Sequence, residues 1–97
     1  MESKEFLSIT EFNSRIKDYL ESNSLFKFVY LRGEISNYKV YPSGHAYFSL
    51  KDDKSLLSAM MWSNRRMGLA FEPKTGDEVV VYGSINVYPP RGSYSFI

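Results

Sequence analysis

The spacing of apolar residues changes along the chain, from a period of about four to a period of two. Phe12, Ile16 and Leu20 recur every four residues, which predicts an amphipathic helix. The run Ser8–Glu11 has the pattern of a capping box, with a serine N-cap followed three residues later by a glutamate. The helix is therefore expected to cover about residues 8–23.

Beyond residue 28 the apolar positions alternate with polar ones, as is typical of strands that are buried on one face. Gly33 and Gly83 lie inside two of the alternating runs, and each predicts a bulge or a sharp bend of the kind that turns a barrel corner. Five strands are expected in all, at residues 28–36, 45–51, 56–62, 78–88 and 94–97.

Turn residues and a short helical pattern separate these strands. Loops are expected at 37–44 and 89–93, and a short helix at 63–71. The order of helix, three strands, short helix and two strands predicts a mainly β fold, a five-stranded Greek-key OB-fold barrel preceded by an N-terminal α-helix. An SH3-like barrel is the structural alternative, and the helical piece before the fourth strand favours the OB-fold. We expect one domain over 1–97, with the barrel at about 28–97.

Composition narrows the functional classes. The 97 residues carry a net charge of only +1, which argues against a protein that coats polyanions without selectivity. Cysteine is absent, so disulfide frameworks and thiolate metal sites are excluded. Aromatic residues are abundant at 16%, and a small core needs only a few of them. Several aromatic rings are therefore expected at the surface, where they can stack on a ligand or cover a partner protein.

The single histidine, His45, is the first candidate for chemistry. Nucleophilic catalysis and zinc binding both need partner residues that this sequence does not supply around it. An exposed strand position is the favoured interpretation, with a contact to a base or a phosphate as the intermediate one. Asp52 and Asp53 fit a hairpin turn better than a cation site. The sequence therefore predicts no catalytic residue, no metal site and no cofactor.

The outward positions of the second strand are more informative as a set. Aromatic and basic residues alternate there, in the loop before it, on the first strand and in the last loop. Rings that stack on any base, together with cations that follow the phosphates, are typical of sites for single-stranded nucleic acid. Each tyrosine alone is as easily explained by cross-strand packing. The predicted nucleic-acid-binding residues are Arg32, Tyr38, Lys39, Tyr41, His45, Tyr47, Lys51 and Arg91.

Several stretches together resemble one family, the N-terminal domain of the exodeoxyribonuclease VII large subunit. The resemblance covers nearly the whole chain, and its most specific parts are the Gly-Glu-Ile-Ser-Asn, Ser-Gly-His-x-Tyr-Phe-x-Leu-Lys-Asp and Pro-Arg-Gly-x-Tyr runs. The matching stretches are "LSITEFNSRIKDYLES" at 7–22, "LRGEISNYKVYPSGHAYFSLKD" at 31–52, "MMWSN" at 60–64, "LAFEPKTGDEVVVYGSINVY" at 69–88 and "PPRGSYSF" at 89–96.

The resemblance implies an OB-fold that binds single-stranded DNA. It implies that the full-length protein degrades single-stranded DNA without a divalent metal, in a cytoplasmic bacterial complex of one large subunit with several small subunits. The family's nuclease site lies in a later domain. We therefore expect this chain to be a non-catalytic fragment of a longer protein, with no membrane contact. The alternative is a protein-interaction or assembly module whose aromatic face covers a subunit of the same complex.

Overall fold

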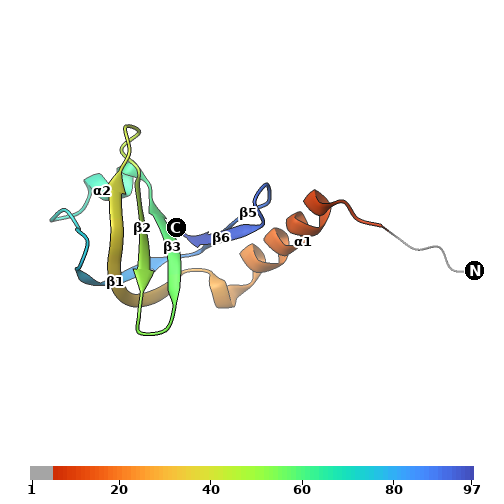
Figure 1. The fold of residues 1–97 in the computed structure, drawn as a ribbon, viewed down its shortest axis with the longest axis horizontal. Coiled ribbons are helices and arrows are strands. Elements are labelled where there is room, and N and C mark those ends of the chain that lie inside the picture. Colours follow the sequence, from red (N-terminus) through yellow and green to blue (C-terminus); the bar gives the residue numbers. More distant parts are fainter. Residues whose placement is uncertain (1–5) are drawn as a thin grey trace, which may run out of the picture.

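The computed structural model describes residues 6–97 and consists of an N-terminal helix followed by a strongly curled sheet (Figure 1). The helices are α1 (Ile9–Ser22), the 3₁₀ turn η1 (Ser24–Phe26) and α2 (Ser63–Met67). The strands are β1 (Val29–Val40), β2 (Ala46–Lys51), β3 (Leu56–Met61), β4 (Glu78–Gly83), β5 (Ile85–Tyr88) and β6 (Ser93–Phe96).

The sheet order is β4-β1-β2-β3-β6-β5. The pairs are antiparallel except β3 with β6, which run parallel and meet at the single position Ala59–Phe96. The two outer strands, β4 and β5, are consecutive in the chain and separated only by Ser84. One bent segment therefore supplies both ends of the sheet and curls it into a barrel-like shape. The predicted mainly β architecture with an N-terminal helix is confirmed.

The structure has six strands rather than five because the predicted strand 78–88 is divided at Gly83 and Ser84. Ser84 exchanges two backbone hydrogen bonds with Ile97, at 3.0 and 2.9 Å. A Cβ atom on residue 83 would lie 2.0 Å from the carbonyl oxygen of Ile97. Glycine is required here because the C-terminal strand passes directly over the backbone.

The first strand is longer than predicted and continues through Val40, so Tyr38 and Lys39 lie in β1 rather than in a loop. Its irregularity lies between Ser36 and Lys39, not at Gly33, where the pairing with β4 is regular. Between these two positions β1 contains one residue more than the facing part of β2, as in a β-bulge. The predicted helix 63–71 is also shorter, since α2 ends at Met67.

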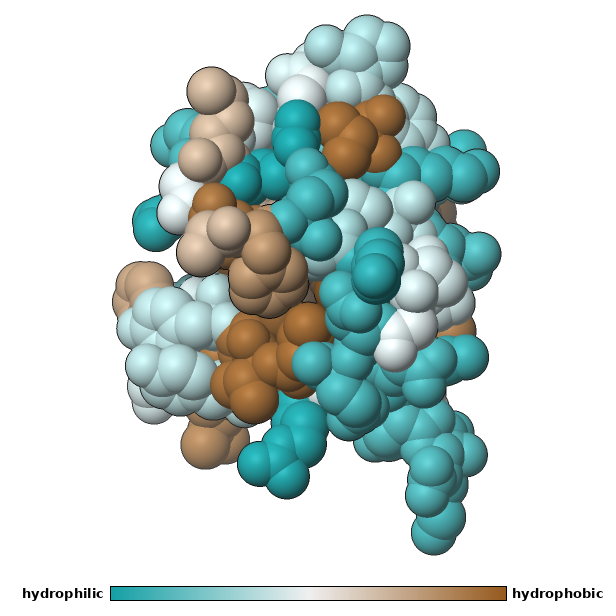
Figure 2. All heavy atoms as spheres, turned by 90° about the vertical axis from the view of Figure 1, so that its left-hand side faces the viewer, coloured by the Kyte–Doolittle hydropathy of each residue, from teal (hydrophilic) through white to brown (hydrophobic). Residues whose placement is uncertain are grey.

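The core is small and follows the predicted alternation. Ala46 and Leu50 of β2 are buried while Tyr47 and Lys51 of β2 are exposed. The central cluster consists of Ile35, Leu50, Ala59 and Phe96. A core of this size leaves many large apolar side chains at the surface, and Figure 2 shows such side chains gathered in one area of an otherwise largely hydrophilic face.

Helix α1 begins where the sequence predicts. Ser8 and Glu11 form both hydrogen bonds of the capping box, at 2.9 and 3.0 Å, and Asn23 is the C-cap. No residue of α1 is buried, and Phe12 on its predicted apolar stripe is 56% exposed. The helix projects to one side of the barrel beside the β5–β6 hairpin (Figure 1). Its attachment to β5 is made by the polar side chains of Lys17 and Glu21.

Candidate nucleic-acid interface

Two exposed tyrosines meet on the outer face of the sheet, at the ends of β1 and β2. Tyr41 and Tyr47 lie edge to face, with their ring centroids 4.8 Å apart, and they are 51% and 41% exposed. Lys39 on β1 and Met60 on β3 lie opposite Tyr47 on either side. This row therefore joins two accessible rings, one exposed cation and one apolar side chain, and we call it the tyrosine platform.

The backbone holds the tyrosine platform in place. The N–H of Tyr41 donates to the carbonyl of His45 at 3.0 Å, and the N–H of Gly44 donates to the carbonyl of Tyr41 at 2.8 Å. Gly44 has a φ of 89°, a conformation that glycine adopts without steric cost. The tight connection between β1 and β2 thus fixes the backbone from which the two rings project.

Tyr38 faces the interior instead of the platform. Its ring packs on Phe48, with centroids 5.7 Å apart, and its hydroxyl donates to Oε2 of Glu72 at 2.7 Å. Partial burial, and then the hydrogen bond and the negative charge of Glu72, raise the pKa of Tyr38 to about 12. Glu72 also pairs with Arg66 at 2.7 Å. Tyr38 therefore joins β1 to the segment after α2.

His45 makes structural contacts within the chain, to the backbone of Ser63 and the ring of Trp62. Its Nδ1 accepts the backbone N–H of Ser63 at 2.9 Å, which satisfies a free donor in the first turn of α2. Its ring stands edge-on to Trp62, with centroids 4.9 Å apart. The half-buried imidazole thus fixes the start of α2 against β2, and Trp62, 44% exposed, lies beside it.

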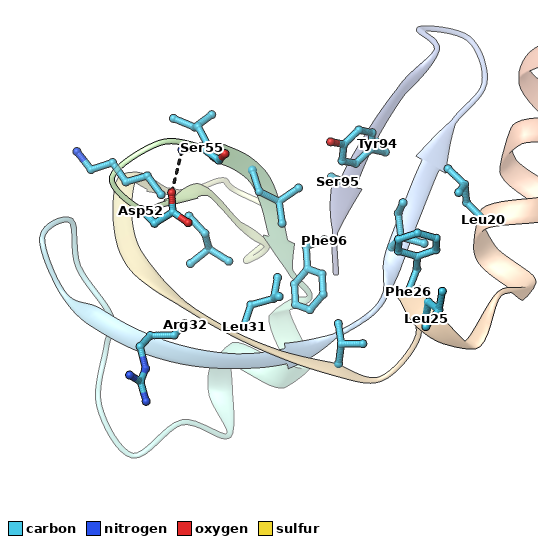
Figure 3. Close-up of a pocket in the computed structure, with 16 residues that line it drawn as sticks. Leu20, Leu25, Phe26, Leu31, Arg32, Asp52, Ser55, Tyr94, Ser95 and Phe96 are labelled. Atoms are coloured by element: carbon cyan, nitrogen blue, oxygen red, sulfur yellow. Dashed lines mark hydrogen bonds between the residues drawn. The ribbon is translucent and has the colours of Figure 1, made fainter.

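The remaining predicted cations are dispersed. Lys51 lies 3.7 Å from the carboxylate of Glu34, and both side chains are nearly half exposed. Arg32 is opposite Val80 on the outer face, and Figure 3 shows its guanidinium pointing away from the interior of the barrel. Arg91 lies in the turn between β5 and β6, and Figure 1 shows this hairpin beside α1 and away from the β1–β2 connection. The structure therefore brings together Lys39, Tyr41 and Tyr47, and not the whole predicted set.

A second group of aromatic side chains lies on the outer face. It was not identified as a group from the sequence. Tyr30 of β1 and Tyr82 of β4 are directly paired, with ring centroids 4.7 Å apart, and Phe28 stacks on Tyr82 at 6.2 Å. We call these three residues the aromatic ladder. Both tyrosines occupy outward positions of their alternating runs, so the pattern contained the signal, but the partner strand of β1 was not known.

The comparisons with known proteins agree with this architecture. Residues 7–97 match the family described as "OB-fold nucleic acid binding domain". The chain belongs to this family. It is also similar to proteins named exodeoxyribonuclease 7 large subunit, being 45% identical over 95 residues to the one from Acholeplasma laidlawii and 46% over 92 residues to the one from Syntrophomonas wolfei. The resemblance found in the sequence is confirmed.

These relatives are much longer than the chain. The match takes in 98% of the chain but 21% of the Acholeplasma protein, and 94% of the chain but 23% of the Syntrophomonas protein. A third relative, from Clostridium novyi, is 40% identical over 93% of the chain and 22% of its own length. The chain thus spans about a fifth of the curated relatives that it matches.

The curled sheet also carries an open, largely apolar hollow of about 780 Å³, near the sparse contact of β3 with β6. Leu31 and Phe96 point into it, and Tyr94 and Phe26 lie at its border (Figure 3). Asp52 at one end accepts the backbone N–H groups of Lys54 and Ser55, which lowers the pKa of its carboxyl. That carboxylate therefore supports the β2–β3 turn.

Among residues 6–97, no group of three or more His, Cys, Asp or Glu side chains could hold a metal ion. None of the helices in the described part of the chain has both the length and the apolar character to cross a membrane.

Proposed function

We propose that this OB-fold binds single-stranded DNA across the tyrosine platform and presents it to the nuclease part of an exodeoxyribonuclease VII large subunit. The observation that carries the proposal is the accessible pair Tyr41–Tyr47 with Lys39 beside it, on the outer face of β1 and β2. Stacked rings accept any base, and a neighbouring cation neutralises a phosphate. Binding is then expected to show little preference for sequence.

The eight residues predicted from the sequence take different parts in this proposal. Tyr41 and Tyr47 are the stacking residues, and Lys39 is the first phosphate contact. Lys51 extends the basic surface with less effect, because Glu34 lies 3.7 Å from its ammonium group. Arg32 lies beyond Glu34 along β1 and is not part of the platform itself. Tyr38, His45 and Arg91 act indirectly or from a distance, since the first two are held by Glu72 and Ser63.

The activity and partners of the intact protein belong to the same proposal. The chain is interpreted as one domain of a longer protein that degrades single-stranded DNA in the cytoplasm together with small subunits. Support comes from the names of the relatives and from the short part of them that the chain covers. The catalytic groups are then expected outside this chain, which is proposed to be non-catalytic.

Fluorescence anisotropy with a labelled oligothymidylate, at low and at raised salt, tests the function. We expect binding that weakens as salt increases, since counterions are released from the phosphates. Replacing Tyr47 by Leu removes the π face and should weaken binding about 5-fold to 150-fold, the range for one stacked base. Tyr47→Phe should retain most of the affinity. Tyr19→Ala is the matched control, because Tyr19 is 69% exposed on α1.

The proposal would be contradicted if the wild-type chain bound no oligonucleotide at low salt. It would also be contradicted if the affinity did not depend on the salt concentration. If Tyr47→Leu instead disrupts assembly with the small subunit of the complex, the platform is a protein-interaction surface, which is the alternative function.

A further inference from the structure

The aromatic ladder lies on the outer face but at the other end of β1 from the tyrosine platform. Phe28, Tyr30 and Tyr82 are 66%, 73% and 57% exposed. Their neighbours along the two strands, Val29 and Val81, pack against the core, so the three rings project outward. Phe28 and Tyr30 both contact the ring of Tyr82, and each of the three rings is more than half exposed, so they form a surface that the fold itself does not need to bury.

The backbone at Phe28 has a strained conformation, and a hydrogen bond holds it beside Tyr82. Phe28 has a φ of 53°, in the left-handed region that costs a bulky L-residue about 1–2 kcal/mol. Its N–H donates to Oγ of Ser84 at 2.9 Å, which fixes this conformation beside Tyr82. An outlier held in place by surrounding hydrogen bonds is a feature that clusters at functional sites.

The charged side chains around the aromatic ladder favour the binding of a polyanion. Arg32 is exposed two residues from Tyr30 on the same face. Arg65 lines a hollow of about 490 Å³ together with Phe28 and Tyr82. Among the described residues that line this hollow there is no aspartate or glutamate. No ion pair involves Arg32 or Arg65 anywhere in residues 6–97.

Acidic groups limit the surface on one side. Glu34 and Glu78 face each other in the register position beyond Arg32, and Glu34 is the partner of Lys51. A strand of nucleic acid is therefore expected to contact Arg32 from the side of the rings and to avoid the glutamate row. This separates the aromatic ladder from the tyrosine platform as a distinct site.

We propose that the aromatic ladder is a second stacking site for single-stranded nucleic acid, with Arg32 and Arg65 as its phosphate contacts. The inference rests on the proposed function, because it assigns a further contact surface for the same ligand. An oligonucleotide long enough to reach both the tyrosine platform and the aromatic ladder contacts both, whereas a short one contacts only one of them. The affinity of the chain should therefore rise with the length of the oligonucleotide, within the range of about 4–16 nucleotides that one OB-fold covers.

Two double variants test the aromatic ladder. Tyr30→Leu with Tyr82→Leu keeps an apolar cover on the strands but removes both π faces, and Tyr30→Phe with Tyr82→Phe keeps the faces and removes the hydroxyls. With an oligothymidylate of about 16 nucleotides, the leucine variant should bind at least about 5-fold more weakly than wild type. The phenylalanine variant should bind like wild type. Circular dichroism and the fluorescence of Trp62 verify that each variant is folded.

Photo-crosslinking gives a direct readout. An oligonucleotide that contains 5-iodouracil should crosslink to Tyr30 or Tyr82 in the wild-type chain, as mapped by mass spectrometry of the digested product. Crosslinks confined to Tyr41 and Tyr47, together with unchanged affinity of the leucine variant, would overturn the second site and leave the proposed function standing. A wild-type chain that binds no oligonucleotide at all would reject both. Equal weakening in the leucine and phenylalanine variants would also overturn stacking.

Discussion

The carboxylate of Glu21 on α1 accepts the backbone N–H of Val87 on β5 at 2.8 Å. The ammonium group of Lys17, one turn earlier, donates to the carbonyl of the same residue at 3.0 Å and to Glu21 at 2.7 Å. Asn13, one turn earlier again, donates to the carbonyl of Pro89 at 2.9 Å. A polar stripe of α1 therefore occupies hydrogen-bonding groups along β5 that a neighbouring strand would otherwise take, which protects that edge.

Removing Glu21 should expose the β5 edge. In Glu21→Ala the N–H of Val87 loses its acceptor, and we expect its amide hydrogen to exchange markedly faster while the amides in β2 and β3 do not change. The loss of a hydrogen bond to a charged group should lower the free energy of unfolding by about 1–2 kcal/mol. Asp18→Ala, on the same helix, is the control. Equal exchange at Val87 in Glu21→Ala and wild type would show that α1 does not guard this edge.

The same contact predicts a dependence on pH. Burial raises the pKa of Glu21, but the hydrogen bonds from Lys17 and from the N–H of Val87 outweigh it and leave the pKa below its ordinary value of 4.5. Because the folded pKa is lowered, the stabilisation is present above the unfolded value and is lost as the pH falls below about 4.5. Thermal unfolding measured across this range should show a weaker pH dependence in Glu21→Gln than in wild type. Parallel curves for the two proteins would contradict this assignment.

Gly83 should not tolerate a side chain. The Cβ of Gly83→Ala would lie 2.0 Å from the carbonyl oxygen of Ile97, so the strand pair must separate at a cost of about 1–3 kcal/mol or more. Gly68→Ala is the matched control, because a Cβ there lies 3.5 Å from its nearest neighbour, the carbonyl oxygen of Arg65. Urea unfolding of the two variants measures the difference. Similar stability in both would show that β6 can move away without loss.

His45 should be replaceable by a residue that keeps the acceptor. Asparagine can present its Oδ1 near the position of Nδ1, so His45→Asn should retain the hydrogen bond from Ser63. His45→Leu leaves that N–H without a partner and should lower stability by about 1 kcal/mol. Both remove the ring that contacts Trp62, and both should change the fluorescence of that residue. If only the leucine variant lost oligonucleotide binding without losing stability, His45 would have a direct role in binding.

Lys39 should contribute one phosphate contact. Replacing it by Gln is expected to lower the slope of log affinity against log salt by about 0.7, the value for one phosphate of a single strand. Lys54→Gln, in the β2–β3 turn at the other end of the hairpin, should leave the slope unchanged. Equal slopes for wild type and Lys39→Gln would remove this residue from the proposed interface.

Local signals predicted the elements well. The capping box at Ser8 fixed the start of α1, and the alternation of β2 gave the faces of Leu50 and Tyr47 correctly. In both cases the deciding information lies within a few residues of the chain, so no tertiary partner needs to be known. Tyr41 and Tyr47 were both predicted for the interface, and the short connection between β1 and β2 brings their rings together.

Non-local geometry explains what the sequence did not show. The bulge after Ser36, with Asn37 at a φ of 53°, adds one residue to β1 and turns Tyr38 toward Phe48. A shift of one residue changes the face of every side chain that follows. The local sequence pattern does not indicate the bulge that causes this shift. The aromatic ladder likewise depends on which strand lies beside β1. The apolar stripe of α1 predicted the helix but not its attachment, because the helix is held through the polar side chains of Lys17 and Glu21.

The way in which α1 is held has a consequence for sequence variation. Its three anchoring side chains bind peptide groups of Val87 and Pro89 rather than their side chains. Every amino acid offers a carbonyl, and every one except proline offers an N–H. Residues of β5 can therefore be exchanged with little effect on the docking of the helix, whereas Asn13, Lys17 and Glu21 have few substitutes. Along this contact, the freedom to vary lies with the strand and the constraint with the helix.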